Sequence, residues 1–338
     1  HEGSLLTAIK LSQEVLRRSN ADLDVIDFDD MVYLPLQRRL KLLQHDWVLV
    51  DEAQDTNPTR RALAAALLRP GRGRLVCVGD PRQAIYGFSG TDNDSLQQLS
   101  DAFSCKHLPL TVSYRCPKAV VEVARRYADH ITAHESAPEG CVTEYAFSEV
   151  MDYVQPGDAV LCRYNKYLVA LAFRLIRGGV AARILGRDVS AGLVKLATRW
   201  SRVTTLNGLE GKLEEWCERE VSKAKAKDDA RRADNAVDTV DTMACLIGRT
   251  RETGGTTVAA LVAVIEALFG EAADMRGCVV LCSGHKSKGQ EWERVHILGL
   301  EELQVRTSRD WQRQQEVNLR YVMVTRAKDT LFLVSGVK

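Results

Sequence analysis

The sequence predicts an α/β protein built from two parallel β-sheets with helices on their faces. Apolar runs of strand length, such as WVLV (47–50) and RLVCVGD (74–80), alternate with longer segments of helical periodicity. Continuous apolar runs are typical of parallel strands that are covered on both faces. More runs of this kind follow after residue 107, so the 338 residues are expected to form two domains of ordinary size.

The first sheet is expected to begin after a helical segment. Apolar residues recur at helical spacing between residues 4 and 43, and the strands 47–50 and 74–80 follow with a helix between them. Asp51 stands directly after the first of these strands, and Asp80 ends the second. Because ligands of parallel sheets gather beyond the carboxyl ends of the strands, both aspartates are candidate site residues.

The remaining runs predict a second sheet that is interrupted by an insert. Residues 1–107 are assigned to a partial first domain, and residues 108–189 and 276–338 to the second. Between them, residues 190–275 are charged and helical in pattern. The Lys/Arg run at 219–232 has two readings, contact with duplex nucleic acid or a solvated helix face, and the second is favoured.

Composition narrows the function classes. The chain is 45% hydrophobic with a net charge of +1, and no stretch has the apolar length of a membrane span. Near-neutral charge argues against a general polyanion binder but leaves room for a local basic groove. The nine scattered cysteines form no CxxC pair, so buried free thiols in a reducing, cytoplasmic compartment are expected rather than zinc sites or disulfides.

Two segments carry residues suited to nucleotide hydrolysis and to base stacking. Asp51 and Glu52 follow a buried strand, where one carboxylate can hold Mg²⁺ and its neighbour can orient or deprotonate a water. Gln83 follows the next strand, where an amide can sense a γ-phosphate. Tyr86 and Phe88 lie on a glycine-flanked loop. They suit stacking on unpaired bases, and packing into the core is the alternative.

Five stretches follow one another along the chain: VDEAQDTN, VGDPRQAIYGFSG, SYRCP, SGHKSKGQEW and LRYVMVTRAK. In this order they resemble helicase motifs II to VI of the UvrD/Rep/PcrA family of superfamily 1. The resemblance covers nearly the whole chain outside the insert. It implies two RecA-like domains, the first one incomplete, with an ATP cleft between them.

For the nucleotide, the resemblance implies ATP and Mg²⁺ as cofactors. Asp51 would hold the metal, Glu52 would be the general base, and Gln83 would couple the γ-phosphate to the DNA site. Tyr114 would stack on the adenine and Arg115 would reach the γ-phosphate. Three further matches complete the expected nucleotide site: Gly289, Glu291 on the ribose, and Arg326 as a second arginine finger.

For nucleic acid, the resemblance implies stacking by Tyr86 and Phe88 and backbone contacts by His285 and Lys288. Phe88 stands where the family usually has Trp, which leaves a smaller π-face. The expected partner is single-stranded DNA and its junctions with duplex, and the expected activity is ATP-dependent translocation from 3′ to 5′.

A phosphate loop is missing from these 338 residues. The only Gly-Lys dipeptide is Gly211-Lys212, which Leu213 follows in the helical insert. A loop of this class needs Gly-x-x-x-x-Gly-Lys-Ser/Thr after a strand. We therefore expect an amino-terminally truncated helicase that is inactive alone, and the initial His1 agrees with this. Its incomplete first sheet is expected to expose an edge or apolar face that invites self-association or a covering partner.

Two alternatives remain at this stage. The motor part of a helicase–nuclease recombination enzyme shares these motifs, and it predicts a carboxylate-rich nuclease domain after motif VI. A non-catalytic DNA-binding relative predicts loss of the catalytic residues, yet Glu52, Gln83, Arg115 and Arg326 are all present.

Overall fold

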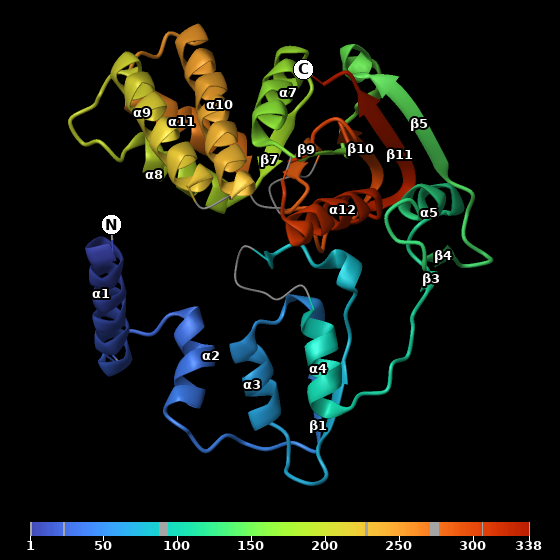
Figure 1. Cartoon of the computed structure of the whole chain (residues 1–338). Helices are drawn as coiled ribbons and strands as arrows, with labels where there is room; N and C mark the ends of the chain where they lie inside the picture. Colours follow the sequence, from blue (N-terminus) through green and yellow to red (C-terminus); the bar gives the residue numbers. More distant parts are fainter. Residues whose placement is uncertain are drawn as a thin grey trace. The chain divides into compact units, whose positions relative to one another are not determined.

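The computed structural model describes residues 2–22, 24–87, 94–226, 229–270, 277–305 and 307–337. The chain divides into two compact units, His1–Leu108 and Pro109–Lys338 (Figure 1). All strand ladders in both units are parallel, as predicted from the apolar runs. Among the described helices, none combines the length and apolar character that crossing a bilayer requires.

The first unit has a two-stranded sheet in which β1 pairs with β2 from Trp47↔Arg74 to Val50↔Cys77. Asn57 caps the helix between the two strands, because its side chain accepts a hydrogen bond from the Arg60 backbone N–H. The elements are α1 (Glu2–Ala21), α2 (Phe28–Gln37), β1 (Trp47–Val50), η1 (Ala53–Asp55), α3 (Pro58–Ala66), β2 (Arg74–Cys77), η2 (Pro81–Gln83) and α4 (Ser95–Phe103).

The helical prediction for residues 4–43 is wrong at its carboxyl end. Helix α2 stops at Gln37, and Arg39 adopts a left-handed φ of 52°. The Leu40 N–H then bonds the Pro35 carbonyl at 2.9 Å, which satisfies an end carbonyl of the helix. Glycine usually marks such an ending, so an arginine in this position gives no signal in the sequence.

One face of the first sheet is apolar and open. Leu49 is 74% exposed and Trp47 56% exposed, and Val76 on β2 is exposed beside them. On the opposite face Val48 and Leu75 are partly buried. The expectation that this sheet presents an exposed apolar face is therefore confirmed.

The second unit has a seven-stranded sheet in the order β5-β11-β10-β6-β9-β7-β8 and a separate pair, β3-β4. Its strands are β3 (Val112–Ser113), β4 (Thr132–Ala133), β5 (Cys141–Ala146), β6 (Ala159–Cys162), β7 (Ala182–Leu185), β8 (Phe269–Gly270), β9 (Val279–Ser283), β10 (Trp292–Leu298) and β11 (Ala327–Ser335). Its helices are α5 (Lys118–Ala124), α6 (Val150–Tyr153), α7 (Asn165–Arg177), α8 (Arg187–Ala197), α9 (Leu206–Lys225), α10 (Ala230–Glu252), α11 (Val258–Leu268) and α12 (Asp310–Val324), with the turn η4 (Phe147–Glu149).

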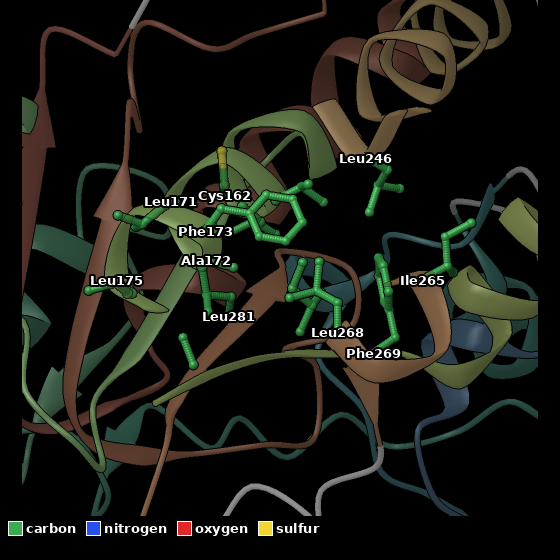
Figure 2. Packing of buried hydrophobic residues seen from close by; sticks show 14 of the residues in the cluster. Cys162, Leu171, Ala172, Phe173, Leu175, Leu246, Ile265, Leu268, Phe269 and Leu281 are labelled. Atoms are coloured by element: carbon green, nitrogen blue, oxygen red, sulfur yellow. The ribbon is translucent and has the colours of Figure 1, made fainter. Parts of the chain in front are cut away.

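The insert is part of the second unit's core. Phe173 on α7, Leu246 on α10, Ile265 on α11 and Leu281 on β9 belong to one buried cluster (Figure 2). A helix crosses the start of the predicted insert, 190–275, and a strand lies just inside its end. Helix α8 already begins at Arg187, and Phe269–Gly270 returns to the sheet as β8 beside β7.

A buried polar cluster fastens the start of β6 to β10. Asp158 is 2% exposed and accepts hydrogen bonds from Arg294 Nε at 2.8 Å and from His296 Nε2 at 2.9 Å. Tyr145 lies 2.8 Å from the other ring nitrogen of His296. Burial alone would raise the pKa of Asp158, but these hydrogen bonds outweigh it and lower that pKa. All nine cysteines are free thiols, as predicted.

The variant Asp158→Asn is expected to lower the free energy of unfolding by about 1–3 kcal/mol, because an amide has a single acceptor oxygen for donors that now share two, among them Arg294 and His296. Since the folded pKa of Asp158 is lowered, the wild-type contribution is present above the pKa of an unfolded aspartate and is lost as pH falls through the folded value. Urea unfolding of both proteins at neutral pH measures the difference. Asp152→Ala, at an exposed position on α6, is the control, and an equal effect of the two changes would contradict the prediction.

Candidate functional site

The two carboxylates predicted at the edge of the first sheet directly follow β1. Asp51 and Glu52 are both exposed, and the Glu52 N–H donates to Asp51 Oδ1 at 2.9 Å. Glu52 has φ 49° and ψ 40°, a left-handed conformation that is rare for a residue with a side chain. This conformation turns the chain sharply from the strand into η1, so that both carboxylates stay at the sheet edge.

A chain of hydrogen bonds joins Glu52 to Gln83. The Gln54 amide donates to Glu52 Oε2 at 2.5 Å, and Gln54 Oε1 accepts from the Asp80 N–H at 3.0 Å. Asp80 Oδ2 in turn accepts from Gln83 Nε2 at 3.0 Å. Gln54 is 2% exposed, so its side chain is held inside this network. The predicted base and the predicted γ-phosphate sensor are thereby connected within one unit.

Gly79 makes this connection possible. A Cβ on Gly79 would lie 2.3 Å from Gln54 Oε1, closer than any atom tolerates. Gln54 was not among the predicted site residues, although it lies only two residues after Glu52. A polar residue so close to a carboxylate at the end of a strand could have indicated a site residue.

The two aromatic residues predicted to stack on DNA bases also belong to this unit. Tyr86 is partly buried, and Phe88 lies outside the described residues. Within the described part of the chain, no group of three or more His, Cys, Asp or Glu side chains could hold a metal ion. Mg²⁺ commonly takes only one or two protein carboxylates and completes its shell with phosphate oxygens and waters, so Asp51 fits such a role.

In the second unit, motifs IV, V and VI meet around Glu291. Its carboxylate accepts from Arg115 Nε at 2.8 Å, and Lys328 Nζ lies 3.7 Å away. Arg115 and Glu291 are both about half exposed, so solvent reaches this pair. Tyr114, next to Arg115, is 80% exposed, and its ring centroid lies 4.5 Å from that of His134.

Arg326 belongs to the same group but is 2% exposed. Its guanidinium donates to the carbonyls of Val322 and Gln290, at 2.8 Å and 3.1 Å, and to Thr325 Oγ1 at 3.0 Å. Burial, and then the nearby charge of Arg115, lower the pKa of Arg326 to about 10, so it stays protonated at neutral pH. In this conformation Arg326 fastens motif V to motif VI, and its predicted contact with a phosphate requires the side chain to move.

The predicted residues of motif V separate into two groups. Glu291 precedes β10 and Arg326 precedes β11, so the group around Glu291 lies at the amino ends of these strands. His285 and Lys288 follow β9 at its carboxyl end. Asp51 and Asp80 follow the carboxyl ends of β1 and β2, as predicted, whereas the group around Glu291 lies at the amino ends of its strands. Gly289 lies between the two groups with a left-handed φ of 80°.

His285 contacts the insert. A guanidinium nitrogen of Arg231, near the start of α10, bonds its Nε2, and the other bonds Gln315 Oε1 at 2.9 Å. Burial and the charges of Arg163 and Arg231 hold the pKa of His285 well below its ordinary value, so the ring is neutral. Arg231 was assigned to a solvated helix face, but it is only 7% exposed. A run of basic residues does not reveal which member points inward.

Two segments of the chain match models of known protein families. Residues 2–104 match the family model of the UvrD/REP helicase N-terminal domain, and residues 198–337 match that of the UvrD-like helicase C-terminal domain. The ATP-dependent DNA helicase Rep of Escherichia coli is 36% identical over 110 residues, which are 30% of this chain and 16% of Rep.

Other relatives align over longer stretches. The ATP-dependent DNA helicase PcrA of Staphylococcus epidermidis is 24% identical over 218 residues, 55% of this chain and 29% of PcrA. The F-box DNA helicase protein 1 of Schizosaccharomyces pombe is 27% identical over 316 residues, 86% of this chain and 34% of that protein. The chain thus spans about a third or less of the length of these relatives.

Proposed function

The chain belongs to the UvrD/Rep/PcrA family of superfamily 1 DNA helicases, and on this premise we propose that it is part of an ATP-driven motor that moves 3′ to 5′ along single-stranded DNA. Rep and PcrA are named as ATP-dependent DNA helicases. The direction of movement and the preference for junctions with duplex follow from the family resemblance. We also propose a cytoplasmic location, since free thiols are typical of a reducing compartment.

The observation that carries the proposal is the meeting of Arg115, Glu291 and Arg326. These residues come from three segments far apart in the sequence, yet Arg115 pairs directly with Glu291, and Arg326 lies close enough to Arg115 for its pKa to respond. Arginines suit phosphate and its transition state, because the planar guanidinium is permanently charged and presents several donors. A carboxylate beside them suits a ribose hydroxyl.

The first unit would supply the other half of the nucleotide chemistry. Asp51 would hold Mg²⁺, and the bound ion would neutralise phosphate charge. Glu52 would accept a proton from the attacking water. The bonds through Gln54 and Asp80 would pass a change at Gln83 back to Glu52. Coupling between phosphate state and DNA grip would therefore start from this network.

For DNA, we propose that Lys288 provides charge and that neutral His285 provides a hydrogen bond. Lys288→Ala is expected to weaken binding of an oligothymidylate to the 338-residue chain. Each phosphate contact on a single strand contributes about 0.7 to the slope of log affinity against log salt, so the slope should fall by about that amount. Fluorescence anisotropy titrations at several salt concentrations measure both quantities.

The matched control is Lys212→Ala, which removes a surface lysine paired with Glu215 on α9. It should leave the affinity and the slope unchanged. If both lysine variants gave the wild-type slope, Lys288 would not touch a phosphate. If the wild-type chain showed no salt-dependent binding at all, the proposed DNA substrate itself would be wrong.

We also propose that the open face of the first sheet, formed by Trp47, Leu49 and Val76, is covered in the working protein by a partner or by a second copy of the chain. Exposed apolar faces of this kind mark interaction surfaces, and an unpaired parallel edge adds a template for pairing. The exposed positions of Trp47 and Leu49 support this proposal.

A further inference from the structure

A groove of about 680 Å³ lies in the second unit among helices α7, α8, α9 and α10. Its apolar lining comes from Leu193 and Leu196 on α8 and from Trp216 on α9. Gly192 opens one wall, because a Cβ there would meet nothing within 4 Å. The volume is in the range of ordinary ligand sites. None of the helicase motifs contributes to the groove.

A buried hydroxyl without a partner lines this groove. Thr242 on α10 is 1% exposed, and its Oγ1 has no hydrogen-bond partner in the described chain. Two other threonines of α10 satisfy theirs: Thr239 donates to the Asn235 carbonyl at 2.7 Å and Thr250 to the Leu246 carbonyl at 2.8 Å. Leaving a buried hydroxyl unpaired is costly, so Thr242 points to a ligand that supplies the partner.

Two cations stand at the rim. Lys195 and Arg199 are exposed, line the groove, and have no carboxylate within 4.0 Å in the part of the chain that the structure describes. Several other cations of the insert lie in ion pairs of their own: Lys212–Glu215, Lys223–Glu220, Arg232–Glu220, Arg249–Glu252 and Arg251–Glu210. The rim therefore offers positive charge that the insert does not use itself.

We propose that this groove binds a short acidic segment of a partner protein through one bulky apolar side chain. The apolar side chain would lie against Leu193, Leu196 and Trp216. Thr242 would bond a backbone group of the segment, and flanking Asp or Glu residues would pair with Lys195 and Arg199. This site is independent of ATP and of the DNA contacts proposed above.

A peptide fits these features better than a nucleic acid does. A strand of nucleic acid carries one phosphate per nucleotide and needs a continuous track of cations. Here only two cations line an apolar floor, which is not a continuous track of positive charge. A peptide with one apolar side chain and acidic neighbours would contact the apolar floor, the Thr242 hydroxyl and the two cations.

The test uses the complete 338-residue chain and a fluorescent, N-acetylated and C-amidated peptide of sequence Glu-Glu-Leu-Phe-Glu-Glu. Anisotropy should show saturable binding. Combined Lys195→Glu and Arg199→Glu changes should weaken it at least about tenfold, more than an isolated surface ion pair would. Gly192→Met, which fills the groove without changing charge, should weaken binding to a similar degree. Thr242→Val should weaken it severalfold and leave the melting temperature equal or higher, because it removes an unpaired buried hydroxyl.

Three controls make the outcome decisive. Arg202→Glu reverses one charge at an exposed position outside the groove and should have no effect. Peptides with Lys in place of Glu, or Ala in place of Leu and Phe, should not bind. The proposal is overturned if the acidic peptide fails to saturate below about 1 mM, if the groove variants bind it like wild type, or if a ten-nucleotide oligothymidylate competes for the groove and loses affinity in the same variants.

Discussion

The 338-residue chain is expected to show no ATP hydrolysis above background, with or without single-stranded DNA. The sequence holds no Gly-x-x-x-x-Gly-Lys-Ser/Thr segment, whose backbone amides and lysine neutralise the phosphates before chemistry starts. Its only Gly-Lys dipeptide, Gly211-Lys212, lies inside helix α9, where the backbone amides are engaged in the helix. Asp51, Glu52 and the two arginines act only on a triphosphate that is already held.

Phosphate release measured with excess oligothymidylate tests this expectation. Turnover should stay at least about a thousandfold below the 1–1,000 per second typical of enzymes. The matched comparison is the same chain fused to a family segment that carries a phosphate loop, in which DNA-stimulated turnover should appear and should be lost on Glu52→Gln. DNA-stimulated turnover by the 338-residue chain that Glu52→Gln abolishes would show that its phosphates are bound by residues not recognised here.

The main strands could be predicted because apolar runs of strand length mark parallel strands, even where one face stays exposed, as at Leu49. The runs at 47–50 and 74–80 became the parallel pair β1 and β2, and those after residue 157 became the strands of the second sheet. The ends of elements were harder. Arg39 and Glu52 adopt left-handed backbone conformations that the surrounding structure imposes, and neither residue type signals them.

The identity of the candidate site residues could be predicted from sequence motifs, but their burial and contacts could not. Motifs gave Arg115, Glu291 and Arg326, and the structure brings these three together. Motifs could not give the burial of Arg326 or the contact of Arg231 with His285, because both depend on how distant segments pack. The groove of Thr242 has no sequence signature either, since a threonine on a helix normally bonds its own backbone.

A second large effect, on stability, is expected from substitution of Glu316. Its carboxylate pairs with the buried Arg163, close to Arg231 of the insert and His285 of motif V. Arg163, at the carboxyl end of β6, is 7% exposed, and its Nε lies 3.2 Å from Glu316 Oε2 on α12. Burial opposes the charge of Arg163, but Glu316 outweighs it and raises the pKa of that arginine. Arg231 and His285 lie close enough to Arg163 for its charge to lower their pKa values.

Glu316→Ala is therefore expected to lower the free energy of unfolding by about 3–5 kcal/mol, because Arg163 would stay buried without its counter-charge and beside Arg231. Replacing both partners, Arg163→Met with Glu316→Leu, should restore most of that loss, since a buried pair often contributes little more than apolar residues of similar size. Urea unfolding of the three proteins measures both steps. Glu215→Ala breaks an exposed pair on α9 and should change stability by less than about 1 kcal/mol.

The double variant separates two roles for this pair. If stability returns but DNA binding does not, the charges around Arg163 serve to hold His285 in place rather than to stabilise the fold. If Glu316→Ala lowers the free energy of unfolding no more than Glu215→Ala does, Arg163 must be accessible to solvent, and the prediction would be wrong. The first outcome is expected, because Arg231 bonds His285 and lies close enough to Arg163 to feel its charge, and the double variant removes that charge.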